Sequence, residues 1–263
     1  MVKLKDLKKE VKRILKDEKV KYVIGYGQGS NGLMPVPAFI EKTEDVEKLV
    51  WTPSCVHNLT LFLVDEKKRK KREKKPDERP VGIVVKGCDS RAINVLLQEK
   101  FIKREDVYIL GVSCENTGVL DEKKLAKKLK GKTVQKVEYD DKDNFVTTLK
   151  DGKVKFTAQE ILAERCIECK ANFPVIYDVF FGEKVNRKPE EPFKSLEKIE
   201  KLSKDDRWAF WKEQLDKCIR CYACRSVCPM CYCDECVVDT INFAVTAGTS
   251  SEEKAQKIKW IEI

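Results

Sequence analysis

Hydrophobic and polar positions in the first part of the chain change between helical and extended spacing. Apolar residues in Leu4–Lys16 recur at helical spacing, which predicts an amphipathic opening helix. Two apolar runs, Pro80–Val85 and Val107–Val112, predict buried strands, and Ala92–Lys100 predicts the helix that joins them. A strand, a helix and a second strand in this order indicate an α/β fold.

Four other segments complete the predicted secondary structure. Lys21–Tyr26 is predicted to be a short buried strand, and Thr43–Val50 a helix with Thr43 as its N-cap. Thr133–Phe156 alternates apolar and polar residues around two turn sequences, which predicts a small antiparallel β excursion. Ser203–Asp216 is predicted to be a helix that leads into a cysteine-rich C-terminal segment.

Charge adds little to this picture. The formal net charge is +9, but charged residues of both signs make up 37% of the chain. Such a mixture resembles the lysine and glutamate enrichment of thermophile proteins more than a nucleic-acid-binding stripe. The densest basic run, Lys67–Lys75, is predicted to be a solvated loop, with a docking surface for an acidic partner subunit as the alternative.

The chain shows no apolar run of the length that spans a bilayer and no signal peptide. Its 12 cysteines then favour metal ligation over disulfides, because thiols stay reduced inside cells. We therefore expect a cytoplasmic protein.

The most specific motif lies near the C-terminus, where four cysteines and a proline follow the pattern C-x2-C-x2-C-x3-C-P. Bacterial-type ferredoxins hold [4Fe–4S] clusters with this run. Three more cysteines follow at once, so the metal-ligand candidates of this segment are Cys218, Cys221, Cys224, Cys228, Cys231, Cys233 and Cys236. A structural zinc site or disulfides are the alternatives.

The number of clusters in this segment stays open. One cluster would use Cys218, Cys221, Cys224 and a later cysteine, either Cys228 or Cys236. Two clusters would need an eighth ligand, with Cys55 or a non-cysteine group as candidates. The sequence thus predicts a ferredoxin-like module at residues 203–263, a charged and proline-rich linker at 183–202, and an α/β domain at 1–182.

A second set of cysteines is dispersed through the α/β domain. Its members are Cys88, Cys114, Cys166 and Cys169. Cys88 and Cys114 follow two predicted strands, and open α/β sheets build their sites at the carboxyl ends of strands. Four thiolates suffice for one [4Fe–4S] cluster, although buried free cysteines are also common core residues. Three basic neighbours, Lys86, Arg91 and Lys170, would raise the reduction potential of a cluster there.

A glycine-rich loop follows the first predicted strand. Gly27, Gly29 and Gly32 match G-x-G-x-x-G, but Pro35 and Pro37 disfavour the helix that a dinucleotide site requires. A loop whose backbone approaches a flavin fits better, and an ordinary turn is the alternative. His57 is the only histidine of the chain, so no histidine-based metal site or catalytic triad can form. It is a candidate donor to a flavin, or a structural histidine.

Three short elements together resemble one known family. Lys86-Gly-Cys88, Val112-Ser-Cys114-Glu-Asn and Cys166-Ile-Glu-Cys169 occur in the order seen in the beta subunits of the coenzyme F420 (deazaflavin) reducing hydrogenase and the related formate dehydrogenase. The resemblance covers about residues 20–182. It implies an α/β core, membership of a larger complex, and four ligands for a [4Fe–4S] cluster beside an FAD that exchanges a hydride with the deazaflavin.

The resemblance extends to the flavin-binding side of the family, where one segment matches and one loop differs. Trp51-Thr-Pro53-Ser resembles the family's flavin-side segment, whereas Gly29-Ser-Asn-Gly32 replaces its Gly-Gly-x-x-Thr loop. The C-terminal module matches the formate dehydrogenase branch better. The resulting candidates for flavin contacts are Gly27, Gly29, Ser30, Asn31, Thr52, Ser54, His57 and Asn58.

The predicted function is an iron–sulfur flavoprotein electron-transfer subunit of a cytoplasmic oxidoreductase complex. Two or three [4Fe–4S] clusters would connect an FAD to a partner such as a formate or tungsten/molybdenum aldehyde oxidoreductase. The soluble carrier could be a deazaflavin, NAD(P) or ferredoxin, with neither nucleic acid nor a membrane span involved. The main alternative is a flavin-free, polyferredoxin-like electron wire between subunits. A zinc-stabilised scaffold or nucleic-acid binder is a third.

Overall fold

The computed structural model describes residues 2–30, 34–114, 118–140, 144–185, 193–219, 221–235, 249–250 and 252–254. The chain forms two compact units, an N-terminal unit of residues 1–192 and a C-terminal unit of residues 193–263. The helices and strands of the N-terminal unit are α1 (Leu4–Lys16), β1 (Val23–Gly27), β2 (Val36–Ile40), η1 (Thr43–Lys48), α2 (Leu61–Arg72), β3 (Val81–Val85), α3 (Gly87–Gln98), η2 (Arg104–Asp106), β4 (Val107–Val112), α4 (Glu122–Leu129), β5 (Val134–Tyr139), β6 (Phe145–Leu149), β7 (Gly152–Phe156), α5 (Ala158–Ile161), α6 (Glu164–Ile167) and β8 (Val179–Phe181).

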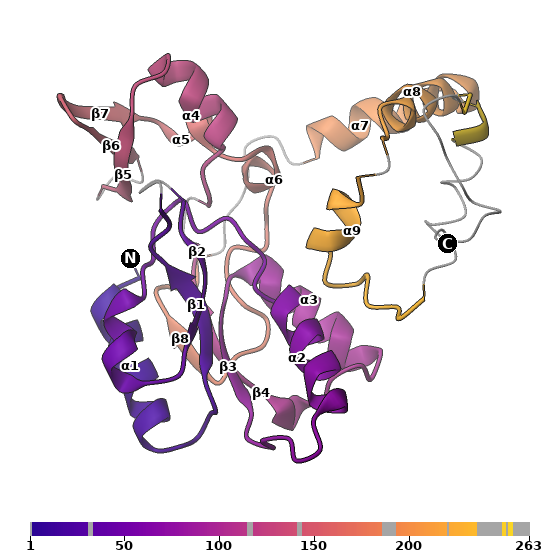
Figure 1. The fold of residues 1–263 in the computed structure, drawn as a ribbon. Coiled ribbons are helices and arrows are strands. Elements are labelled where there is room, and N and C mark those ends of the chain that lie inside the picture. The colour runs from indigo at the N-terminus through magenta and orange to yellow at the C-terminus, as the bar shows by residue number, and fades with distance from the viewer. Residues whose placement is uncertain are drawn as a thin grey trace. The chain divides into compact units, whose positions relative to one another are not determined.

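A five-stranded sheet forms the centre of the N-terminal unit, with the strand order β2-β1-β3-β4-β8 (Figure 1). β1, β3, β4 and β8 are parallel, and β2 pairs with β1 in the antiparallel direction. All five residues of β3 are buried, as expected for a strand that is covered on both faces. The predicted α/β core is therefore confirmed.

Helices cover both faces of this sheet. α1 packs Leu7, Val11 and Ile14 onto one face, where they meet Val84 and Leu110. α2 and α3 lie on the other face (Figure 1). The predicted opening helix is confirmed with both of its bounds, because its apolar stripe faces this core.

A small antiparallel sheet lies between β4 and β8 in the sequence. Its strand order is β5-β6-β7, and α4 and α5 pack on it around the fully buried Phe145. The segment is closed at its base by a bridge between Leu120 and Leu162 and by a hydrogen bond of 2.9 Å from the Ala163 N–H to the Val119 carbonyl. The predicted antiparallel excursion is confirmed.

Two predictions in the first half of the chain were wrong in part. The helix predicted at Thr43–Val50 is a 3-10 helix that covers Thr43–Lys48, and Lys42 instead of Thr43 occupies the N-cap position. The Thr43 hydroxyl donates to Glu44 and makes no cap. The Lys67–Lys75 run is not a loop throughout, because α2 continues to Arg72. Its basic residues suit the C-terminal end of a helix, where they complement the helix dipole.

The helix after β3 begins earlier than its apolar spacing indicates. α3 starts at Gly87 instead of Ala92, so the turn that carries Cys88 is helical. The Asp89 carboxylate accepts the backbone N–H of Lys86 at 3.0 Å and so caps this turn. β2 is also absent from the predicted elements, since Pro37 disfavours a strand except at the edge of a sheet, where β2 lies.

The C-terminal unit is described over part of its length. Its helices there are α7 (Lys194–Glu200), α8 (Lys204–Asp216) and α9 (Ala223–Val227). The Ser203 hydroxyl accepts the Asp206 N–H at 3.1 Å and caps α8, which confirms the predicted helix. Ile219 and Val227 are exposed by 84% and 66%, so these apolar side chains do not form a core within the described part of this unit. The ferredoxin-like fold stays a prediction.

Candidate functional site

The segments that follow β3 and β4, which are the first turn of α3 and a loop, carry the first two cysteines of the dispersed set. β3 ends at Val85 and β4 at Val112, so Cys88 and Cys114 lie directly beyond their carboxyl ends. The two strands are parallel neighbours, paired from Val81–Val107 onward. Their cysteines therefore lie at the same edge of the sheet, where open α/β folds place their sites.

A third loop brings in the other two cysteines. Cys166 lies in α6 and Cys169 follows it. The chain then crosses the edge of the sheet, where the Cys114 N–H donates to the Asn172 carbonyl at 2.7 Å. A second hydrogen bond, from the Val175 N–H to the Ser90 hydroxyl at 3.0 Å, ties the same segment to α3. Three cysteine-bearing loops thus contact one another.

Glycines allow these loops to approach so closely. A Cβ at Gly87 would lie 1.8 Å from the Ala171 carbonyl oxygen and 2.9 Å from the Phe173 nitrogen. A Cβ at Gly118 would lie 2.6 Å from Cβ of Cys166 and 2.8 Å from its Sγ. No other residue type fits either position without moving a cysteine-bearing loop.

The thiols of this set influence one another. Cys88 is exposed, and Cys114, Cys166 and Cys169 are half-buried. Burial is the main cause that raises the pKa of Cys114 to about 12; the Lys86 ammonium opposes this rise, while the Cys88 and Cys166 thiols add to it. The Ala171 N–H donates to Sγ of Cys169 at 3.2 Å, the kind of contact that tunes cluster sulfurs.

The donor set fits a [4Fe–4S] cluster, which takes four cysteine thiolates. Bound iron would also deprotonate these thiols, whatever their pKa without metal. Within the described residues, no three His, Cys, Asp or Glu side chains are arranged to hold a single metal ion. Their assignment as cluster ligands stays a prediction.

A buried lysine lies directly behind the Cys88 turn. Lys86 is 3% exposed, and its ammonium lies 3.0 Å from the Asp89 carboxylate. It also donates to the Tyr26 hydroxyl and, at 2.8 Å, to the main-chain carbonyl of His57. Burial alone would lower the pKa of Lys86, but the Asp89 carboxylate raises it well above its ordinary value, so the side chain is charged.

The loop at residues 51–60, the flavin-side loop, contains four of the predicted flavin contacts. Ser54 is 1% exposed, and its hydroxyl has no hydrogen-bond partner among the described residues. Asn58 accepts the Thr60 N–H at 3.0 Å, and the Thr52 hydroxyl accepts the Ser54 N–H at 3.3 Å. The His57 ring is exposed. The orphaned Ser54 hydroxyl fits a polar ligand at this edge of the sheet.

The glycine loop supplies the remaining predicted contacts. Gly27 ends β1, and a Cβ at Gly29 would lie 2.0 Å from the Met34 carbonyl oxygen, so the loop turns tightly at that position. Ser30 is exposed, and Asn31 lies outside the described residues. None of these positions is tested as a flavin contact, and all of them stay predictions.

Cys55 does not suit the role of an eighth ligand. Its side chain is completely buried, and its Sγ accepts the Thr52 N–H at 3.3 Å. Burial raises the pKa of the Cys55 thiol to about 11. An enclosed and protonated thiol behaves as a small apolar core residue.

The C-terminal cysteines are open to solvent. Cys218, Cys221, Cys224, Cys231 and Cys233 are exposed and Cys228 is half-buried, whereas Cys236 lies outside the described residues. The short helix α9 carries Cys224, and the Cys231 N–H donates to the Cys228 carbonyl at 3.2 Å. Their division between one or two clusters stays open.

Sequence reasoning missed Tyr26 and Asp89. Tyr26 ends up beside Lys86 because β1 and β3 are neighbours in the sheet, which no local pattern reveals. Asp89 could have been found from its spacing, since an acidic residue in the first turn commonly caps a helix.

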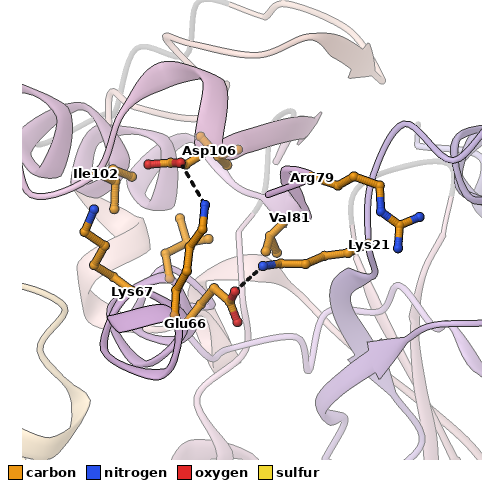
Figure 2. Close-up of a pocket in the computed structure, with 10 residues that line it drawn as sticks. Lys21, Glu66, Lys67, Arg79, Val81, Ile102 and Asp106 are labelled. Atoms are coloured by element: carbon orange, nitrogen blue, oxygen red, sulfur yellow. Dashed lines mark hydrogen bonds and ion pairs between the residues drawn. The ribbon is translucent and has the colours of Figure 1, made fainter. Parts of the chain in front are cut away.

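Two cavities lie at the opposite end of the strands. A hollow of about 720 Å³ and a smaller one of about 30 Å³ both border the buried ion pair of Lys21 and Glu66. Figure 2 shows the smaller one, where Lys21, which precedes β1, meets Glu66 of α2 beside Val81 at the start of β3. None of the predicted site residues lines either cavity.

Comparison with known proteins supports the resemblance read from the sequence. Residues 78–196 match the family model for the C terminus of the coenzyme F420 hydrogenase/dehydrogenase beta subunit. This match includes all four dispersed cysteines and ends before the C-terminal run. The chain resembles the coenzyme F420 hydrogenase/dehydrogenase beta-subunit family.

One curated relative is also a beta subunit of an F420-dependent enzyme. The chain is 24% identical over 171 residues to the F420-dependent formate dehydrogenase 1 subunit beta of Methanococcus maripaludis. That alignment covers 61% of this chain but only 42% of the relative. The chain therefore corresponds to less than half the length of this relative.

One solved structure is similar to part of this chain. The F420-reducing [NiFe] hydrogenase complex of Methanosarcina barkeri matches with a TM-score of 0.45 and 17% identity over 63% of this chain and 58% of the matched chain. Separately, none of the helices in the described parts of the chain is both long and apolar enough to cross a membrane.

Proposed function

We propose that this chain is an iron–sulfur flavoprotein electron-transfer subunit of a cytoplasmic oxidoreductase complex. The observation that carries the proposal is the convergence of three cysteine-bearing loops at the carboxyl edge of the sheet, within the segment that matches the family model. The F420-dependent formate dehydrogenase beta subunit is the relative that suggests a hydride carrier.

The residues have distinct roles in this proposal. Cys88, Cys114, Cys166 and Cys169 would hold one [4Fe–4S] cluster, and the flavin-side loop would hold an FAD. When bound, the flavin supplies the exchange between hydride transfer and single-electron transfer, and the clusters carry the single electrons. The sheet edge keeps the cysteine loops fixed, because each is anchored by backbone hydrogen bonds and close glycine contacts.

The remaining cysteines would continue the path. The run from Cys218 to Cys236 would hold one or two further clusters and pass electrons to a partner subunit, such as a formate or tungsten/molybdenum aldehyde oxidoreductase. The soluble carrier is a deazaflavin, NAD(P) or ferredoxin.

Anaerobic purification with measurement of iron, sulfide and acid-extractable flavin per chain tests this proposal. We expect about eight or more irons and one flavin per chain, from four irons per cubane cluster. Cys166→Ser should lose about four irons and one electron paramagnetic resonance (EPR) signal, while Cys55→Ser, the matched control, should keep both. Unchanged iron and spectra in Cys166→Ser would refute the cluster assignment.

A flavin-free electron wire is the second candidate. It is favoured by the departure of Gly29-Ser-Asn-Gly32 from the family's flavin loop. The same preparation separates the two functions. A fluorescent acid extract indicates a flavoprotein, whereas a brown protein with a non-fluorescent extract indicates a wire.

A further inference from the structure

The Lys86 side chain joins two loops that are far apart in the sequence. Its ammonium has three polar partners, two that accept hydrogen bonds and one that forms an ion pair. They are the Asp89 carboxylate at 3.0 Å, the Tyr26 hydroxyl, and the His57 main-chain carbonyl at 2.8 Å. A lysine that is this buried and this completely paired has a fixed position.

One of these contacts leads to the cysteine turn. Asp89 Oδ2 accepts the Lys86 backbone N–H at 3.0 Å, and its Oδ1 lies 3.6 Å from Sγ of Cys88. The carboxylate is 1% exposed, so it lies between the ammonium and the sulfur without access to water. The positive charge of Lys86 is therefore separated from the Cys88 sulfur by the Asp89 carboxylate.

The other two contacts lead to the flavin-side loop. The Tyr26 hydroxyl accepts from Lys86 and donates to the His57 carbonyl, so both side chains hold the same backbone oxygen. Tyr26 is 1% exposed, and its ring packs edge-on against Trp51 at 5.9 Å between centroids. The beginning and the middle of the loop are thus both fixed to this cluster of buried groups.

We propose that Lys86 is a positioning residue that holds the flavin-side loop at a fixed spacing from the Cys88 turn and keeps a positive charge behind that turn. The identity of the two cofactors rests on the function proposed above. The mechanical link itself rests only on the contacts of Lys86, Tyr26, Asp89 and His57.

The first experiment measures the mechanical link by amide hydrogen exchange on the full chain. Lys86→Met should raise the exchange rate of the amides of residues 51–60 at least tenfold. Tyr26→Phe keeps the ion pair and removes one hydroxyl, so it should give a smaller increase in the same peptide. Lys21→Met is the matched control, since Lys21 is also buried and paired with Glu66 but lies at the other end of the sheet (Figure 2). Lys21→Met should leave the exchange rate of the amides of residues 51–60 unchanged.

The second experiment measures charge through the midpoint potential of the cluster whose EPR signal disappears in Cys88→Ser. Lys86→Met should lower this potential, Asp89→Asn should raise it, and the double variant should return it close to the native value. A positive charge near a cluster favours its reduced form. The double variant also avoids an unpaired buried charge. Should Lys86→Met fail to fold, the rise in potential expected in Asp89→Asn decides the role of the charge. Loss of a group that orients a metal-ligating residue commonly costs ten- to hundredfold in metal affinity, so iron retention should fall in Lys86→Met.

The outcomes separate this inference from the proposed function. Loop exchange in Lys86→Met and Tyr26→Phe that matches Lys21→Met would overturn the mechanical link. A cluster potential that stays constant across the Lys86 and Asp89 variants would overturn the role of the charge. A native protein without iron at Cys88 would overturn the proposed function instead, while the exchange experiment would still decide whether Lys86 positions the loop.

Discussion

Gly87 offers the sharpest test of how the cysteine loops are assembled. In Gly87→Ala the new Cβ would lie 1.8 Å from the Ala171 carbonyl oxygen and 2.8 Å from its carbon. Ordinary contacts of a Cβ begin near 3.4 Å, so the two backbones must separate by about 1.6 Å. The obstacle is main chain, which cannot rotate away as a side chain can.

The expected cost follows from this displacement. Overpacking in a close-packed site costs about 1–3 kcal/mol. Loss of the Cys114–Asn172 backbone hydrogen bond, which closes the same loop, adds about 1 kcal/mol. We therefore expect the free energy of unfolding to fall by about 2–4 kcal/mol and the iron content to fall by about four per chain.

The assay combines iron and sulfide analysis with EPR of the reduced protein and thermal unfolding. Gly82→Ala is the control, because its Cβ would lie 2.8 Å from Cγ2 of Val23 in the same sheet. It should lose stability yet keep native iron content, since no cysteine loop is displaced. If Gly87→Ala keeps the native iron content and EPR spectrum, Cys88 and Cys169 do not share one cluster.

Three further predictions concern single side chains. The buried Thr147 hydroxyl has no partner among the described residues, so Thr147→Val should raise the free energy of unfolding by about 1 kcal/mol in urea titrations. Burial opposes a low pKa for Glu66, but Lys21, Tyr22 and Arg69 lower it below 4.5. The stability from Glu66 is therefore present above about pH 4.5 and lost as the pH falls further. In Glu66→Gln the free energy of unfolding at pH 7 should be about 3 kcal/mol lower than in the native protein. This variant should also lose less stability as the pH falls below about 4.5. Because the Cys55 thiol is enclosed, Cys55→Ala should keep all iron and should consume as much thiol reagent under native conditions as the native protein does.

Local patterns predicted the elements that carry the cysteines. The apolar runs of β3 and β4 placed Cys88 and Cys114 at one edge of the sheet, because parallel neighbouring strands end on the same side. The opening helix and the antiparallel excursion followed equally from spacing. These features depend on burial of one face or both, and such burial leaves a periodic trace in the sequence.

The contacts behind the site left no such trace. Tyr26 and Lys86 are 60 residues apart, and their contact depends on the order of strands in the sheet. The start of α3 at Gly87 depends on an Asp89 cap that outweighs the low helix propensity of glycine. The cysteine-rich segment of the C-terminal unit lacks the apolar spacing that predicts helices and strands. Its sequence therefore indicates the metal ligands but not the secondary structure that carries them.

The closure of the small sheet at its base has a consequence for variation in chain length. Leu120 and Leu162 lie side by side, and the Asp121 N–H donates to the Ile161 carbonyl at 2.7 Å. The polypeptide therefore leaves the edge of the large sheet and returns to it at nearly the same point. Residues inserted or deleted at the far turns, such as the one at Asp151, would alter the size of this projection without changing the separation of Cys114 and Cys166. The projection can thus diverge between homologues, or accept an inserted tag, while the cysteine loops stay in place.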